Sequence, residues 1–342
     1  MKGNTRLLTQ RQSKRMPCAI KMNYNITSLL DEHDFRDKKR LQEPIVEKYQ
    51  YFNKNKTNEM IDCGRYLEFA LFQNKSDRDL KEKKLDKMYT CKDRFCPFCN
   101  WRRARKLAIQ SYEVLEAIQS EKNVRYLFVT LTVRNCPIGQ LSDTITYMNK
   151  AFKRMIEWKR LKGSILGWSR ILEYPPQKTD PSMMHPHYHC LIAVPTGYFG
   201  RDKNMYIKQE EWQSLWKKAL KVDYDPSVDV RVIKAKNGID PIAKAVAEFA
   251  KYPLKSVDIK PLSVDQFQEL AYQMKRKRAV AFGGILKEYR KKLSLDDVED
   301  GDLVYSDSVR EEEWQRIATL IYQYKSGEQG LDYYLKEINH ES

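Results

Sequence analysis

The sequence of 342 residues lacks several features that mark common protein classes. It contains no apolar run of the ~20 residues that a membrane-spanning helix needs, and no apolar signal-peptide core near Met1. It also contains no Gly-x4-Gly-Lys-Ser/Thr motif for cradling phosphates, and no internal repeat. We therefore expect a cytoplasmic protein without a membrane span, and the missing phosphate motif argues against an ATP-driven motor.

Acidic residues are too few to balance the basic ones. The chain has 62 Lys and Arg against 46 Asp and Glu, a formal net charge of +16. A surplus of this size favours a polyanionic partner, because neutralising phosphates releases counterions and drives binding. A soluble basic protein without such a partner would fit the charge equally well.

Cysteine is also scarce, and four of the seven cysteines lie in a pattern. Cys91, Cys96 and Cys99 are closely spaced, and Cys63 lies upstream. In a reducing cytoplasm such clusters indicate metal sites rather than disulfides, and four thiolates suit a tetrahedral structural Zn²⁺. A set of buried free thiols is the alternative. The remaining cysteines are expected to be ordinary buried residues: Cys18, Cys136 and Cys190.

Basic and aromatic residues flank these cysteines. We expect a cationic face that contacts a phosphate backbone, formed by Lys92, Arg94, Arg102, Arg103, Arg105 and Lys106. Three aromatic residues interleave with them: Phe95, Phe98 and Trp101. These rings could stack on unpaired bases or form the small core of the module, and both interpretations stay open.

Histidine is rare, yet three of the five histidines fall in the stretch His185-Pro-His-Tyr-His189. The apolar run that follows, up to Val194, predicts a β-strand. Alternate side chains of a strand share a face, so His187 and His189 are expected about 7 Å apart on one side. Two imidazoles on one rigid face can bind a divalent metal. A polar strand edge is the plainer interpretation.

A carboxylate is expected to complete this group. Glu173 ends the preceding predicted strand, so pairing of the two strands brings it close to His187 and His189. Two imidazoles and one carboxylate leave coordination positions open, as a catalytic metal requires, and phosphate-bearing substrates favour Mg²⁺ or Mn²⁺. His185 is a further candidate ligand. The alternative role of Glu173 is a salt bridge with a lysine.

A candidate nucleophile lies in the segment Glu248-Phe-Ala-Lys-Tyr252-Pro-Leu-Lys255. Glu248 and Tyr252 are four residues apart and share one face of a helix. The tyrosine phenol is a poor nucleophile until a cation favours the phenolate, which a metal and Lys251 or Lys255 could supply. Glu248 could act as a general base. Taken alone, a tyrosine on a charged helix usually only packs.

The periodicities predict an α+β fold. Strands are expected at 126–133, 166–174, 187–194 and 228–232, and helices at 102–120, 141–156, 212–220 and 242–252. These elements form one sheet with helices packed on it. We expect four parts: a basic flexible arm (1–58), a Cys-rich zinc module with a helix (59–120), a catalytic domain (121–260) and a helical, highly charged C-terminal region (261–342).

Four motifs in this order resemble those of plasmid rolling-circle replication initiators of the single-tyrosine type, within the HUH endonuclease superfamily. They are Cys91-Lys-Asp-Arg-Phe-Cys96-Pro-Phe-Cys99, Phe128-Val-Thr-Leu-Thr132, His185-Pro-His-Tyr-His189 and Glu248-x3-Tyr252-x2-Lys255. The match covers roughly residues 63–258. It implies an HUH catalytic domain with a central antiparallel sheet of ferredoxin-like or RNA-recognition-motif-like design, and a tyrosine helix beside the histidine strand.

The resemblance also implies an activity. Such initiators nick one strand at the double-strand origin, stay attached to the 5′ end through a phosphotyrosine, and leave a 3′-hydroxyl primer. Tyr252 would be the nucleophile, with acid-base roles for Glu248 and Lys255. The expected partners are plasmid origin DNA, single-stranded or extruded at the nick site, and the host helicase and DNA polymerase. The C-terminal region is the first candidate for origin binding. The oligomeric state, a homodimer included, stays open.

Three alternatives remain from the sequence. A relaxase or transposase of the same superfamily would use the same chemistry for mobilisation. A non-catalytic, zinc-stabilised DNA-binding regulator would account for the charge and the cysteines. A metal-dependent hydrolase would activate water and leave Tyr252 with only a packing role.

Overall fold

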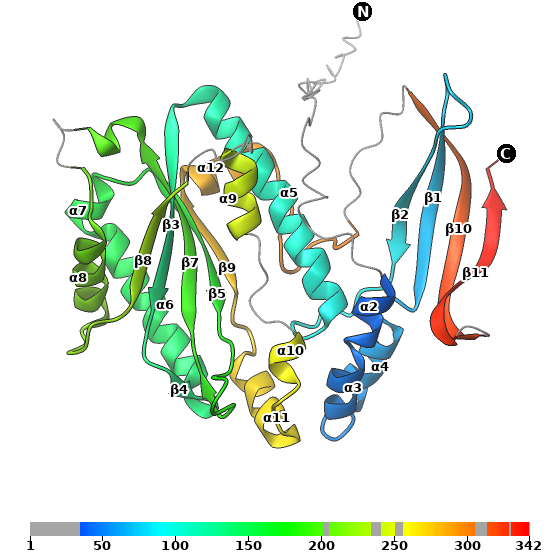
Figure 1. Ribbon diagram of the computed structural model, residues 1–342, viewed down its shortest axis with the longest axis horizontal. Helices are drawn as coiled ribbons and strands as arrows, with labels where there is room; N and C mark the ends of the chain where they lie inside the picture. The colour runs from blue at the N-terminus through cyan, green and yellow to red at the C-terminus, as the bar shows by residue number, and fades with distance from the viewer. Residues whose placement is uncertain are drawn as a thin grey trace, which may run out of the picture.

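The computed structural model describes residues 35–200, 205–233, 241–249, 256–304, 313–327 and 330–341. These residues form two separate antiparallel sheets, of five and four strands, with helices packed on and between them (Figure 1). A short pair joins β4 (Cys136–Pro137) to β6 (Met183–Met184). The predicted α+β architecture of antiparallel strands and flanking helices is therefore confirmed.

The five-stranded sheet carries the histidine strand at its centre. Its strand order is β8-β3-β7-β5-β9, and all neighbours are antiparallel. The strands are β3 (Val124–Thr132), β5 (Gly167–Glu173), β7 (His187–Pro195), β8 (Val228–Val232) and β9 (Val280–Gly284). The first four coincide with predicted strands, because β-branched and aromatic residues favour a pleated, buried surface. The fifth, β9, falls in the region predicted to be helical.

Alternation along β7 places the core on both faces of this sheet. Cys190 and Ile192 belong to one hydrophobic cluster, and Leu191 and Ala193 belong to another. The first cluster is covered by α6 (Leu141–Glu157), α7 (Lys159–Lys162) and α8 (Gln209–Leu220). The second is covered by α5 (Pro97–Glu121), α9 (Pro241–Phe249) and α12 (Ile285–Lys292). Short turns η1 (Ile138–Gln140) and η2 (Thr196–Phe199) complete this part.

The four-stranded sheet joins distant parts of the chain. Its order is β11-β10-β1-β2, and β1 therefore pairs on both sides. The ring centroids of Phe69 in β1 and Tyr322 in β10 lie 5.7 Å apart, in an edge-to-face contact. The strands are β1 (Tyr66–Asn74), β2 (Lys81–Met88), β10 (Trp314–Gly327) and β11 (Gly330–His340).

These strands correct the prediction of a helical C-terminal region. Among the residues of that region that the structure describes, only α11 (Val264–Gln273) and α12 are helices, whereas β9, β10 and β11 are strands. In β10 the run from Ile317 to Tyr322 is mostly apolar and rich in β-branched residues, which favours a strand. The dense charge of the surrounding region hides this short run. No helix among the described residues is long and apolar enough to cross a membrane.

From residue 35 onward, where the description of the chain begins, three helices precede the four-stranded sheet: α2 (Phe35–Arg40), α3 (Glu43–Tyr49) and α4 (Lys54–Asp62). Ile45 and Tyr49 of α3 are buried, and the Tyr49 ring lies 5.0 Å from the ring of Phe267 in α11. The expected flexible arm is therefore corrected for residues 35–58, because apolar side chains anchor these helices to the core. The short helix α10 (Ser256–Ile259) precedes α11 along the chain.

Candidate active site

Two neighbouring strands, β5 and β7, bring the candidate metal ligands together. Glu173, the last residue of β5, lies opposite His187 in β7. One step along, Ile171 of β5 and Thr130 of β3 lie on either side of His189. Directly paired residues point to the same face of a sheet. The sheet therefore presents the carboxylate and both imidazoles on one face.

The carboxylate reaches both imidazoles. Oε2 of Glu173 lies 3.3 Å from Nε2 of His187 and 3.4 Å from Nε2 of His189. The two rings are perpendicular, with centroids 4.9 Å apart. Ligand atoms that bind one ion at about 2.1 Å lie about 3.0–3.4 Å from one another. These three residues could therefore hold one metal ion.

His185 supports the site without joining the ligand group. Its Nδ1 lies 2.6 Å from Oδ1 of Asn135, and its backbone carbonyl accepts a hydrogen bond of 2.9 Å from Nδ1 of His187. Burial, together with the charge of His187, lowers the pKa of His185. Among the described residues, the potential ligand group contains Glu173 and does not contain His185.

Thr130 is a site residue that sequence reasoning did not single out. Its Oγ1 lies 3.1 Å from Nδ1 of His189. Because the Nδ1 atoms of both histidines have partners, both Nε2 atoms face Glu173, and the ring orientations are fixed. The Phe128 ring stacks on the His189 ring with centroids 5.3 Å apart. The available signal was the strand motif Phe128-Val-Thr-Leu-Thr132, to which the sequence alone gave no role.

The surroundings keep Glu173 ionised. Burial raises the pKa of this carboxyl, but the hydrogen bonds and charges of His187 and His189 outweigh burial and lower the pKa to about 2. The side chain is therefore a carboxylate at neutral pH, which is the form that binds a cation. Within the described residues its ion-pair partners are the two histidines and not a lysine.

The helix that carries part of the nucleophile motif covers the same face of the sheet. Helix α9 packs against β3 and β7, and Phe249 at its end shares a hydrophobic cluster with Phe128. Phe128 in turn stacks on His189. Glu248 lies in the last turn of α9. The side chain of Glu248 is outside the described residues, as are Lys251, Tyr252 and Lys255.

A second potential metal group lies where α4, the loop before α5 and the start of α5 meet. The Sγ atoms of four buried cysteines lie within 4.8 Å of one another: Cys63, Cys91, Cys96 and Cys99. Cys63 lies 3.6 Å from Cys96 and from Cys99, measured between Sγ atoms. Thiolates bound to Zn²⁺ at about 2.3 Å lie about 3.8 Å apart, so the spacing fits that ion. Cys136 and Cys190 are free and buried, as expected.

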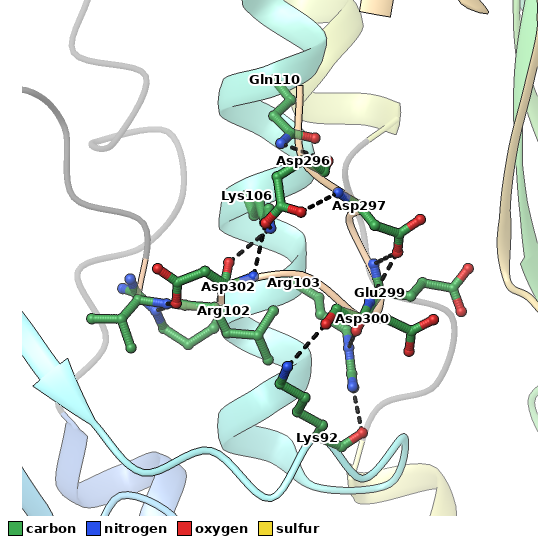
Figure 2. A network of polar contacts seen from close by, with 12 residues as sticks. Lys92, Arg102, Arg103, Lys106, Gln110, Asp296, Asp297, Glu299, Asp300 and Asp302 are labelled. Carbon is green, nitrogen blue, oxygen red and sulfur yellow. Dashed lines mark hydrogen bonds and ion pairs between the residues drawn. The ribbon is translucent and has the colours of Figure 1, made fainter. Parts of the chain in front are cut away.

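The basic residues of α5 turn inward. Figure 2 shows the acidic segment 296–302 lying across this helix and holding its side chains. Arg102 donates to the backbone carbonyl of Leu303, and Arg103 donates to that of Glu299. Both arginines are buried. This corrects the expectation that Arg102 and Arg103 form a face for DNA, because their donors are satisfied within the protein.

The other residues of the expected cationic face differ in how deeply they are buried. Lys106 is only 1 % exposed, and its Nζ lies 2.6 Å from a carboxylate oxygen of Asp296. Arg94 is half-buried and donates to the carbonyl of Lys277, and Arg105 is also half-buried. Phe95 and Phe98 are buried in the core. Of the two interpretations of these rings, the small core of the module is the one observed.

Comparison with known proteins agrees with the geometry. A family model described as "Replication protein" matches residues 82–334. A "Protein rep" from Bacillus sp is 38% identical over 267 residues, which cover 73% of this chain and 84% of that protein. A "Protein rep" from Bacillus amyloliquefaciens is 35% identical over 299 residues, which cover 80% and 86%. One from Streptococcus pneumoniae is 36% identical over 251 residues, which cover 73% and 76%.

No solved structure matches the chain. The family model spans more than half of the chain, and the relatives match over most of their own length. The chain therefore belongs to the replication protein family of plasmid rolling-circle replication initiators.

Proposed function

We propose that this initiator nicks one strand of the plasmid origin and becomes linked to the new 5′ end through Tyr252. The observation that carries the proposal is the group of Glu173, His187 and His189 on the sheet face that α9 covers. Helix α9 ends at Phe249, so Tyr252 follows shortly after it in the chain. This order supports a nucleophile that works beside the ligand group.

The proposed reaction exchanges one phosphodiester for another. The phenolate oxygen of Tyr252 attacks the phosphorus, and the bond to the 3′ oxygen breaks. That oxygen takes a proton and leaves as a 3′-hydroxyl, while the 5′ phosphate stays on the tyrosine. Attack by a 3′-hydroxyl on the phosphotyrosine reverses the step and rejoins a strand. Because bond energy is conserved, no ATP is needed, which agrees with the absence of a phosphate-cradling motif.

Glu173, His187 and His189 would hold the catalytic divalent cation. The ligand atoms of these residues and the phosphate oxygens of the substrate suit Mg²⁺ or Mn²⁺. The ion would polarise a phosphate oxygen and stabilise the charge that develops on it. Thr130 and the carbonyl of His185 hold the two imidazoles in the orientation that this requires. The four-cysteine group would hold a structural Zn²⁺.

Glu248 and the nearby lysines have supporting roles in the proposal. Glu248 would act as a general base toward the water that ends the cycle. Lys255 would favour the phenolate of Tyr252, and Lys251 would contact the DNA backbone. In the cytoplasm, a host helicase and a host DNA polymerase would then act at the nick, since this chain carries neither activity in its motifs.

An adduct assay tests the proposal. Single-stranded oligonucleotides that tile the origin of the encoding plasmid, labelled at the 3′ end, are incubated with the full chain and Mg²⁺ or Mn²⁺. We expect a labelled protein band that survives denaturation, because the 3′-side fragment is the one joined to tyrosine. The adduct should be lost in Tyr252→Phe and kept in Tyr147→Phe, which removes a hydroxyl from an exposed tyrosine of α6.

The outcomes separate the competing functions. His187→Ala and His189→Ala should slow nicking severely, and Glu248→Ala should nick while failing to release the product. Cleavage without an adduct would favour a hydrolase that uses activated water. Binding without cleavage would favour a regulator. Cleavage at a transfer origin, and none at the replication origin, would favour a relaxase.

A further inference from the structure

Two cavities lie along the chain segment that leads into β9. One, of about 530 Å³, is lined by Lys275, Arg276 and the start of α6. The other, of about 700 Å³, is lined by Asn149 of α6, by β9 and by α12. Neither cavity contains the candidate metal ligands. They are therefore separate from the site described above.

One face of α6 connects the two cavities. Ser142, Thr146 and Asn149 are spaced so that they share this face. The backbone N–H of Ser142 donates to the side chain of Gln273, and Thr146 accepts a hydrogen bond of 2.8 Å from Nζ of Lys277. The segment 272–282 thus runs along α6 and then along the outer edge of the sheet. We call the combined depression the β9 groove.

Basic side chains dominate the β9 groove. Lys275, Arg276 and Lys287 line it and are exposed. Arg170 and Arg290 line its deeper part. Two carboxylates line it as well: those of Asp143 and Asp297. Arg278 is already engaged, since it lies 2.6 Å from Asp297 and 3.6 Å from Glu299. The remaining surplus is positive, which favours an anionic ligand.

Aromatic rings lie beside the charged groups of the β9 groove. Tyr272, at one end of the groove, is 71 % exposed, which is unusual for so large an aromatic side chain. In the deeper part the guanidinium of Arg170 lies 4.5 Å from the centre of the Tyr188 ring. That of Arg290 lies 4.2 Å from the centre of the Phe282 ring. These two guanidinium groups are thus already stacked on rings of the protein, and Tyr272 offers the exposed ring of the groove. A positive groove with an exposed aromatic ring can hold unpaired bases on a charged backbone.

The groove lies close to the candidate metal ligands. Val280 of β9 is paired with Ile171 of β5, and Ile171 is paired with His189 of β7. Neighbouring strands are about 4.8 Å apart, so the backbone of β9 lies about 10 Å from that of the histidine strand. Arg170 and Tyr188 line the groove from the α6 face of the sheet, whereas the ligand group lies on the face that α9 covers. A DNA strand with its reacting phosphate at the ligand group would therefore reach the groove by passing over the edge strand β9.

We propose that the β9 groove binds the single-stranded DNA that flanks the nick site. The proposal rests on the proposed function for its substrate, and it adds a surface that the nicking chemistry does not require. A single strand fits better than a duplex, because a duplex keeps its bases stacked inside and meets a protein through its grooves. A concave, positive site with the exposed ring of Tyr272 instead suits bases that are free to stack.

Binding measurements in a Tyr252→Phe background test the groove without the covalent step. The test variant is Lys275→Gln/Arg276→Gln/Lys287→Gln, and the control Lys54→Gln/Lys81→Gln/Lys325→Gln removes three exposed charges from α4, β2 and β10. Fluorescence anisotropy is recorded with a single-stranded oligonucleotide and with a duplex at several salt concentrations. We expect the test variant to bind the single strand about 10- to 100-fold more weakly at 0.1 M salt, with a salt slope reduced by about 0.7 per lost phosphate contact.

A second variant examines the aromatic contribution. Tyr272→Ala removes an exposed ring and no charge, so it should weaken single-strand binding at least about fivefold while leaving the salt slope unchanged. Tyr51→Ala, also 71 % exposed but on the turn between α3 and α4, is the matched control.

The outcomes decide the proposal independently of the nicking mechanism. If both groove variants bind the single strand like their controls, the groove is not a DNA site, even where the wild type forms the tyrosine adduct. If only duplex binding falls, the single-strand assignment is overturned. If the wild type forms no adduct and yet the groove variants lose single-strand binding, the groove proposal holds and the nicking proposal fails.

Discussion

The two histidines of the candidate site differ in how each ring is held. His187 donates from Nδ1 to a backbone carbonyl, whereas His189 relies on the hydroxyl of Thr130. A backbone partner cannot be removed by substitution, but a hydroxyl can. Thr130 is therefore the position at which orientation of a ligand can be tested without removing the ligand.

Replacing Thr130 with Val should weaken metal binding about 10- to 100-fold, because a partner of this kind fixes the orientation of a metal-binding histidine. Isothermal titration with Mn²⁺ measures the effect directly, and the Mn²⁺ concentration needed for half-maximal nicking should rise in parallel. Thr132→Val is the matched control, since the hydroxyl of Thr132 donates instead to the carbonyl of Ser227. Equal affinities in the two variants would rule out the proposed role of Thr130.

Lys106 is a buried cation whose charge is balanced by one carboxylate. Its Nζ contacts Asp296 and also the carbonyl of Asp302. The hydrogen bond from Lys106 lowers the pKa of Asp296 below its ordinary value of 3.8. Because the pKa is lower in the folded protein, the ion pair stabilises the fold above about pH 3.8, and this stabilisation is lost as the pH falls through the folded value.

Asp296→Asn should therefore reduce the free energy of unfolding by about 1–2 kcal/mol at pH 7, a modest value because Asp296 is half exposed. Urea unfolding at pH 7, 5 and 3 measures the difference between variant and wild type, which should shrink at pH 3. Asp300→Asn, in the same segment but 83 % exposed, should change little. A constant difference at all three pH values would contradict the assignment.

At the scale of elements, α5 connects the two halves of the structure. Its first turn supplies Cys99 to the cysteine group, and its middle packs on the five-stranded sheet. The side chain of Gln42, just before α3, donates to Sγ of Cys96. Helices α2 and α3 are thus held by the same group of thiols. Loss of a metal there should loosen both the helices and the start of α5.

Cys96→Ala should abolish binding of the structural Zn²⁺ and lower the melting temperature by at least about 10 °C, because metal binding contributes directly to the stability of such sites. Native mass spectrometry counts the bound ions, and calorimetry gives the melting temperature. Cys136→Ala, which also removes a buried free thiol, should keep the metal. Zinc retained at full stoichiometry in Cys96→Ala would refute the four-thiolate site.

At the scale of the whole molecule, neither sheet is complete without the C-terminal part of the chain. Strand β9 closes one edge of the five-stranded sheet, and β10 pairs with the full length of β1. A chain that ends at residue 312 keeps only β1 and β2 of the second sheet. Two strands alone are marginally stable in water.

This truncated chain should expose Phe69 and Leu67, which are buried in the full protein, and should aggregate. A chain that ends at Gly327 keeps β10 and loses only the edge strand β11, so it should stay soluble. Size-exclusion chromatography with light scattering distinguishes the two. A monodisperse, normally melting chain of 312 residues would show that β10 is dispensable.

The sequence predicted the structure best where a strand-like apolar run lies next to a rare residue type. Three histidines next to an apolar run predicted the ligand strand, and antiparallel pairing then placed Glu173 correctly beside it. Strand β9 was harder to predict from the sequence, because the pair Gly283 and Gly284 is typical of a turn. In the structure Gly284 has a φ of +55°, and a Cβ there would lie 2.3 Å from the carbonyl oxygen of Leu166. The backbones approach closely, and only glycine permits this.

The inward arginines show a second limit. Arg102 and Arg103 resemble a DNA-contacting pair in composition, but backbone carbonyls more than a hundred residues away along the chain, at Leu303 and Glu299, accept their hydrogen bonds. Residue type gives the number of donors and not the identity of the acceptors. Such contacts depend on tertiary folding, which short-range patterns do not report.

The pairing of β1 with β10 has a consequence for synthesis of the protein. Translation proceeds at about 5–20 residues per second, so the ribosome takes roughly 12 to 50 seconds to travel from β1 to β10. During that interval β1 lacks one of its two neighbours, although all four cysteines of the metal group have already emerged. The nascent chain must therefore hold an unfinished sheet until β10 has been synthesised.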